Sequence, residues 1–225
     1  SRDPLIQLEE EMKLRGFSKS TRESYLYSVK QCLTFSKKSP KEVTAEDVRA
    51  FLLSLGDQGR SASTLNSAYS ALQFYFGKIL RRGFFARIPR AKQPKKFPTV
   101  LSKEEVKKMI VGTKNIRHRC MLSLLYGCGL RVGELVRLRM SNIDLDRRVI
   151  HITRSKGAKD RITILPASLM VTLQKQRLVK SADDYLFTNG RGGHLTEATI
   201  QKVVAQAAAR GGIKKSVSPH TLRHS

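Results

Sequence analysis

A basic segment interrupted by prolines divides the sequence near its middle and limits the possible folds more than any other feature. The stretch from Lys78 to Lys96 contains no carboxylate. Three prolines, Pro89, Pro94 and Pro98, lie within ten residues at its end. Because proline fixes φ and lacks an amide hydrogen, prolines at this density cannot continue a helix. We therefore expect an extended linker at residues 94–98, between a first domain at residues 1–93 and a second at residues 99–225.

Before the linker, apolar residues recur at spacings of three and four, which is typical of amphipathic helices. Ser20–Glu23 and Thr44–Asp47 resemble capping boxes, in which a hydroxyl and a carboxylate three residues apart bind the first amides of a helix. Gly56 is expected to end the second of these helices. The expected helices cover residues 4–15, residues from 20 onward, residues 44–56 and residues 62–80. Four short helices predict a small basic bundle.

The sequence after the linker mixes helical and strand patterns. Ser102–Glu105 is a further capping pattern, and an apolar helix is expected from Ile116 to Tyr126. Two runs rich in β-branched residues, 149–153 and 161–165, flank a turn that contains glycine and predict an antiparallel hairpin. Further helices are expected at residues 167–178 and 196–210. The predicted fold class is mainly α with a small antiparallel β-sheet (α+β).

Net charge indicates the class of partner. Lys and Arg number 43 against 18 Asp and Glu, which gives +25 over 225 residues, and such a surface attracts polyanions. The 40% of hydrophobic residues are enough for a packed core, so the charge does not imply disorder. Since Trp is absent and aromatic residues make up 7%, binding that depends on base stacking is disfavoured, and the backbone of a duplex is the better target. An RNA- or ribosome-binding protein is the alternative that charge alone allows.

Other features of the sequence concern location and cofactors. No run of about 18 apolar residues occurs, and Ser1–Pro4 does not resemble the start of a signal peptide, so we expect a cytoplasmic protein. The three cysteines, Cys32, Cys120 and Cys128, form no spacing typical of a metal site. The sequence therefore predicts neither a metal nor another cofactor.

Two short segments carry charged residues that could perform chemistry. In Gly129–Leu135, Arg131 and Glu134 are three residues apart on an expected helix and so share a face. Lys156 and Lys159 lie at the tip of the expected hairpin, where a flexible ammonium can reach a phosphate. Taken alone, each could also be an ordinary solvated surface group.

A third segment lies at residues 218–224. Pro219 suits the first position of a helix, and His220 and Arg223 then share one face of it. Imidazole and guanidinium groups near a helix start could bind a phosphate, although either could also cap the helix or extend into solvent.

Together the three segments resemble, in order and spacing, the tyrosine recombinase (phage integrase) family, and most closely its Xer-type members. Gly129–Leu135 is similar to the first arginine box of the family, Ser155–Arg161 to its β-hairpin lysine segment, and Pro219–Ser225 to its His-x-x-Arg box. The helical first half is similar to the SAM-like core-binding domain. The resemblance implies a C-shaped clamp around double-stranded DNA and a site-specific recombinase; a simple phage or transposon integrase is the alternative.

The resemblance also implies roles for individual residues. Arg131 and Arg223 would hold the scissile phosphate, and their planar donors would stabilise the charge of a pentavalent transition state. Lys156 would be the general acid that protonates the departing 5′ oxygen. His220 would contact the phosphate and assist proton transfer, while Glu134 would support the site by orienting its neighbours.

Basic residues of the linker region and the hairpin are expected to contact the DNA backbone. Lys159 is also the alternative to Lys156 for the lysine role. The expected DNA-binding residues are Lys78, Arg81, Arg82, Arg87, Arg90, Lys92, Lys95, Lys96, Lys159 and Arg161.

The nucleophile of the family is a tyrosine downstream of the His-x-x-Arg box. All six tyrosines here lie upstream of His220, so the resemblance implies a C-terminally incomplete chain that binds DNA without cleaving it. A noncatalytic DNA-binding fragment of the same fold is the alternative. The resemblance further implies a tetramer on DNA for the complete protein and weak self-association for this chain. The tyrosines are Tyr25, Tyr27, Tyr69, Tyr75, Tyr126 and Tyr185.

Overall fold

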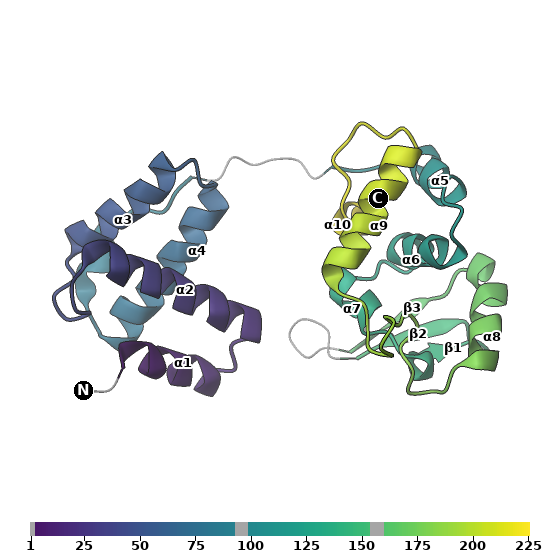
Figure 1. Cartoon of the computed structure of the whole chain (residues 1–225), viewed down its shortest axis with the longest axis horizontal. Coiled ribbons are helices and arrows are strands. Elements are labelled where there is room, and N and C mark those ends of the chain that lie inside the picture. Colours follow the sequence, from purple (N-terminus) through teal and green to yellow (C-terminus); the bar gives the residue numbers. More distant parts are fainter. Residues whose placement is uncertain (1–2, 93–98, 154–159) are drawn as a thin grey trace. The chain divides into compact units, whose positions relative to one another are not determined.

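The chain forms two compact units, residues 1–96 and residues 97–225, in a computed structural model (Figure 1). The structure describes residues 3–92, 99–153 and 160–225. The expected linker at residues 94–98 lies outside this described part. Four of the predicted functional residues also lie outside it: Lys95, Lys96, Lys156 and Lys159.

The N-terminal unit is a bundle of four α-helices, followed by a π-helix and a 3₁₀-helix (Figure 1). Its elements are α1 (Pro4–Leu14), α2 (Lys19–Ser36), α3 (Ala45–Asp57), α4 (Ala62–Leu72), a π-helix (Gln73–Ile79) and a 3₁₀-helix (Gly83–Arg87). Leu8, Val29, Val48 and Leu72 come from different helices and are fully buried together in one core. The four-helix prediction is thus confirmed, because the apolar stripes of the helices meet in a single cluster.

Hydroxyl caps begin most of these helices. Thr44 and Asp47 form the expected capping box at α3, where the Thr44 Oγ1 accepts from the Asp47 amide at 3.2 Å. The prediction for α2 was wrong in position: Ser18, and not Ser20, is the cap, and its Oγ accepts from the amide of Thr21 at 3.2 Å. Gly56 does not end α3, which continues for one more residue.

The fourth expected helix changes its hydrogen-bond pattern part-way. After Leu72 the chain continues as a seven-residue π-helix, Gln73–Ile79, and the amide of Leu80 donates to the carbonyl of Tyr75 at 3.0 Å, five residues back. Tyr75 and Phe76 are fully buried there, with ring centroids 5.0 Å apart. The wider turn therefore directs two neighbouring aromatic residues into the same core.

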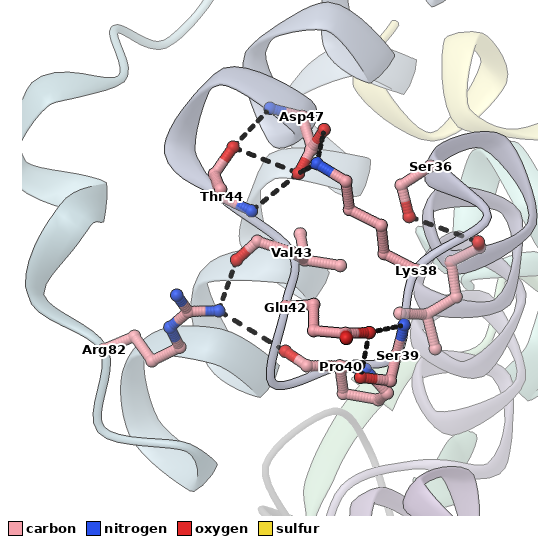
Figure 2. A network of polar contacts seen from close by, with 10 residues as sticks. Ser36, Lys38, Ser39, Pro40, Glu42, Val43, Thr44, Asp47 and Arg82 are labelled. Carbon is pink, nitrogen blue, oxygen red and sulfur yellow. Dashed lines mark hydrogen bonds and ion pairs between the residues drawn. The ribbon is translucent and has the colours of Figure 1, made fainter.

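Figure 2 shows how polar side chains hold the loop between α2 and α3. Lys38 pairs with Asp47 at 2.8 Å. Arg82 donates from Nη1 to the carbonyl oxygens of Pro40, at 3.4 Å, and of Val43 (Figure 2). Its guanidinium also lies 5.1 Å from the centre of the Phe84 ring. Arg82, which the sequence suggested as a DNA contact, thus binds backbone of its own domain.

In the C-terminal unit, helices pack beside a three-stranded antiparallel sheet (Figure 1). Its strands, in the order β1-β2-β3, are β1 (Ile143–Asp144), β2 (Val149–Ile152) and β3 (Arg161–Ile164). Its helices are α5 (Lys103–Val111), α6 (Ile116–Gly127), α7 (Val132–Val136), α8 (Met170–Val179), α9 (Glu197–Arg210) and α10 (Pro219–His224), with 3₁₀ turns at Met140–Asn142 and Ala167–Leu169.

The predicted hairpin is confirmed, with Val149 opposite Ile164 and Ile152 opposite Arg161. The short strand β1 was not expected from the sequence. Helix α6 passes through the centre of this unit and buries Leu122, among other residues, completely. Because α5, α7, α9 and α10 all pack on α6, this helix is central to the helical part of the unit.

Two further observations concern the described residues as a whole. None of their helices is both long and apolar enough to cross a membrane. All three cysteines are unpaired thiols buried in the cores, and burial raises their pKa values to about 12 for Cys32, about 12 for Cys120 and about 11 for Cys128.

Candidate functional site

Arg131 stands at the start of α7, directly after a tight turn. Gly129 in that turn has φ +57°, a conformation that glycine adopts without strain. Arg131 itself is the residue before the helix, so it does not lie within a helix as the sequence suggested. Glu134, in the first turn of α7, still meets it: its carboxylate accepts from the Arg131 amide at 2.8 Å and from Arg131 Nη1 at 2.7 Å.

Glu134 also binds a second arginine, from the sheet. Arg161, the first residue of β3, donates from Nη2 to Glu134 Oε2 at 2.8 Å. The Glu134 side chain is only 7% exposed. Burial by itself raises the pKa of this carboxyl, but the hydrogen bonds from Arg131 and Arg161 outweigh that effect and hold the pKa below its ordinary value. Glu134 is therefore a buried carboxylate clamped between two guanidinium groups.

Arg223 brings a third guanidinium into the same electrostatic environment. It lies on α10, which Ser218 caps and Pro219 begins, as the sequence predicted. Burial lowers the pKa of Arg223, and the positive charges of Arg131 and Arg161 lower it further. Its Nη1 is buried and has no hydrogen-bond partner among the described residues. Three arginines and one carboxylate leave a local excess of positive charge with an unused donor, which suits an anion.

His220 lies one turn before the end of α10 and is exposed. Its Nε2 is 2.9 Å from Nε2 of His224, and the two ring centroids are 4.3 Å apart. Sequence reasoning missed His224, although the i, i+4 spacing of two histidines could have indicated this contact.

Two protein-family models match the chain. Residues 99–225 match the model of the phage integrase family, and residues 5–84 match its N-terminal SAM-like domain. The chain belongs to the phage integrase family. Among its curated relatives, the putative integrase/recombinase y4qK of Sinorhizobium fredii is 32% identical over 226 residues, covering 98% of this chain and 73% of the relative. Tyrosine recombinase XerA of Pyrococcus furiosus is 35% identical over 221 residues, covering 95% and 75%.

A solved structure extends the agreement to the fold of this integrase-family chain. A lambda integrase tetramer bound to a Holliday junction matches it with a TM-score of 0.76, over 98% of this chain and 70% of that one. The sequences are 20% identical. The predicted class, a SAM-like helical domain followed by an integrase-type α+β domain, is thereby confirmed.

The other basic residues predicted to bind DNA have different surroundings in this integrase-family chain. Lys78, Arg81 and Lys92 are exposed. Arg90 donates to Gln73 Oε1 at 3.2 Å and lies 4.7 Å from the centre of the Tyr69 ring, so part of its surface is used internally. Arg87 ends the 3₁₀-helix, and its side chain lies outside the described part of the structure.

Within residues 3–92, 99–153 and 160–225, the structure brings no three His, Cys, Asp or Glu side chains together in a way that could hold an ion. The candidate site consists of the guanidinium groups of Arg131, Arg161 and Arg223 and the Glu134 carboxylate. His220 lies on the same helix as Arg223.

Proposed function

We propose that this chain binds duplex DNA and supplies the phosphate-binding site of a site-specific recombinase, an enzyme that cleaves and rejoins DNA strands through a 3′-phosphotyrosyl intermediate. The observation that carries the proposal is the shared environment of Arg131, Arg161 and Arg223, in which a buried guanidinium N–H of Arg223 is unused. Simple polyanion binding needs only exposed charge. A partly buried set of arginines held by a carboxylate is better suited to one phosphodiester in a fixed orientation.

In this mechanism Arg131 and Arg223 hold the nonbridging oxygens of the scissile phosphate. Attack by a tyrosine hydroxyl forms the new O–P bond while the bond to the 5′ oxygen breaks, and negative charge accumulates on the pentavalent phosphorus group. Guanidinium groups stay protonated and present fixed donors to that charge. Lys156 donates a proton to the departing 5′ oxygen, while His220 contacts the phosphate and assists the transfer of the proton that the attacking tyrosine hydroxyl loses.

The proposal assigns a part to each domain. Residues 1–93 form the core-binding domain, residues 94–98 the linker and residues 99–225 the catalytic domain. The exposed residues Lys78, Arg81 and Lys92 contact the DNA backbone. Several copies assemble on DNA, as the tetramer of lambda integrase does on a Holliday junction. Relatives named XerA and XerD support an Xer-type reaction.

We further propose that none of the six tyrosines of this chain is the nucleophile. Tyr69 and Tyr75 are buried in the N-terminal core. Tyr126 packs against the core of the C-terminal unit, and the Tyr185 hydroxyl accepts from Arg139 Nη2 at 3.2 Å. Tyr27 is 64% exposed but belongs to the N-terminal unit, as does the partly buried Tyr25. The 225-residue chain is therefore expected to bind DNA without cleaving it.

Duplex binding at several salt concentrations tests the proposal. Because neutralised phosphates release counterions, affinity should fall about a hundredfold or more between 50 and 200 mM salt. Arg131→Ala and Arg223→Ala should each weaken binding about tenfold, as expected for a lost charge-assisted hydrogen bond. Arg147→Ala is the matched control, since its side chain is 82% exposed on the same unit. Salt-independent affinity, or equal effects in all three variants, contradicts the proposal.

A covalent-trapping experiment tests the tyrosine assignment. A pool of nicked suicide duplexes retains any phosphotyrosyl adduct, because the cleaved end is lost by diffusion. The 225-residue chain should give no adduct on a denaturing gel. An adduct that peptide mapping places on any of the six tyrosines would show the assignment to be wrong.

A further inference from the structure

Arg161 has the charge of a DNA contact, but the structure gives it internal partners. We infer that Arg161 is a positioning residue, which locks the Glu134 carboxylate against Arg131 and ties the start of strand β3 to the phosphate site. This inference rests on the proposed function, because it concerns how that phosphate site is held. It differs from the role that the sequence suggested for Arg161, which was direct contact with the DNA backbone.

The bonding of the Glu134 carboxylate supports this role. Its Oε1 accepts from Arg131 Nη1 at 2.7 Å. Its Oε2 accepts from the Arg131 amide at 2.8 Å and from Arg161 Nη2 at 2.8 Å. Arg161 thus reaches Glu134 from across the fold, whereas Arg131 is a sequence neighbour three residues away. Fixing both oxygens removes the rotation of the carboxylate that would otherwise let the Arg131 guanidinium move.

Arg161 also binds the turn that precedes Arg131. The same Nη2 donates to the carbonyl of Gly129 at 3.1 Å. Two residues along β3, Thr163 donates from Oγ1 to the carbonyl of Cys128 at 3.0 Å. Side chains alternate along a strand, so both inward-facing residues of β3 are attached to successive carbonyls of this turn. The intervening residue, Ile162, is 61% exposed on the other face.

These contacts connect two of the three motifs physically. Strand β3 begins two residues after the segment that contains Lys156 and Lys159, which lies outside the described residues. Because β3 is attached to the turn at Gly129, the start of this strand is fixed relative to Arg131. A lysine at the same place could not replace Arg161 fully, because its ammonium ends one covalent bond short of Nη2, the nitrogen that makes both contacts.

A double-mutant cycle on duplex binding separates the two roles of Arg161. If Arg161 acts through Glu134, Arg161→Ala and Glu134→Ala should each weaken binding about tenfold, and the double variant should bind no more weakly than either. Arg161→Lys should restore only part of the loss. Additive losses of about a hundredfold, or full affinity in Arg161→Lys, would indicate direct contact with DNA and overturn the inference. Arg147→Ala serves again as the charge-matched control.

A second readout does not depend on DNA. Titration of the Glu134 carboxyl by carbon-13 NMR of the full chain should show a higher pKa in Arg161→Ala than in wild type, while Arg147→Ala leaves it unchanged. An unchanged pKa in Arg161→Ala overturns the inference even if the chain binds no DNA. If wild type binds no duplex but the pKa rises, the proposed DNA function fails while the lock on Glu134 stands. Circular dichroism of each variant confirms that it is folded.

Discussion

Replacing Arg82 by methionine should destabilise the N-terminal unit. The substitution keeps an apolar stem but removes the bonds from Nη1 to the Pro40 and Val43 carbonyls and the contact over Phe84 (Figure 2). A hydrogen bond from a charged donor contributes about 1.5 kcal/mol, and a cation–π contact about 0.5–1 kcal/mol. Because Arg82 is only partly buried, we expect a loss of about 2 kcal/mol, a large share of a typical domain's stability.

Hydrogen exchange of the full chain, read by mass spectrometry, measures this loss of stability within the N-terminal unit. A change of about 2 kcal/mol corresponds to roughly 30-fold faster exchange of the amides between α2 and α3, provided that they exchange by unfolding of the unit. Lys78→Met is the matched control, because Lys78 is exposed in the same unit and carries the same charge. If Arg82→Met exchanges no faster than Lys78→Met, Arg82 does not stabilise the unit and the reasoning is refuted.

Three further outcomes are expected. Gly127→Ala should lower the melting temperature through a loss of about 1–3 kcal/mol, because a Cβ there would lie 2.7 Å from Cγ of the rigid Pro166 ring; an unchanged melt would refute the clash. Since the pKa of Glu134 is lowered by folding, its contribution to stability is present above the unfolded value of about 4.3 and is lost as pH falls through the folded value. On acidification, the free energy of unfolding measured by chemical denaturation should therefore fall less in Glu134→Gln than in wild type. An equal fall in both proteins would contradict this. The three buried cysteines should react with a thiol reagent at pH 8 only after denaturation, because burial raises their pKa values to about 11 or 12; rapid reaction of the native chain would show that they are accessible.

Local sequence signals predicted most of the helices, because caps and apolar spacing act within a few residues. The boxes at Thr44 and Ser102 formed as expected. The error at α2 has a tertiary cause: Phe17 packs against Phe74 of the π-helix with ring centroids 5.1 Å apart, and this contact favours a helix start at the neighbouring Ser18. A local pattern with two serines offers no way to choose between them.

The partners of the arginines could not be predicted, because they depend on contacts far along the chain. Arg82 and the carbonyl of Val43 are 39 residues apart, and Arg161 and Glu134 are 27 apart. Charge alone made both arginines equivalent to exposed Lys78. The site was easier to predict, since motif order indicated that Arg131, Glu134 and Arg223 belong together. The structure places these three residues in one electrostatic environment. Their catalytic roles stay predictions.

The π-helix after α4 makes this part of the gene sensitive to insertions and deletions. Each residue of an α-helix turns the chain by about 100°, so loss of one codon within Gln73–Ile79 would restore ordinary helical bonding and rotate everything after it. Tyr75 and Phe76 could not then both keep their buried places, and Arg82 would point away from the α2–α3 loop. A reading frame shortened by three nucleotides would therefore misdirect the whole end of the domain.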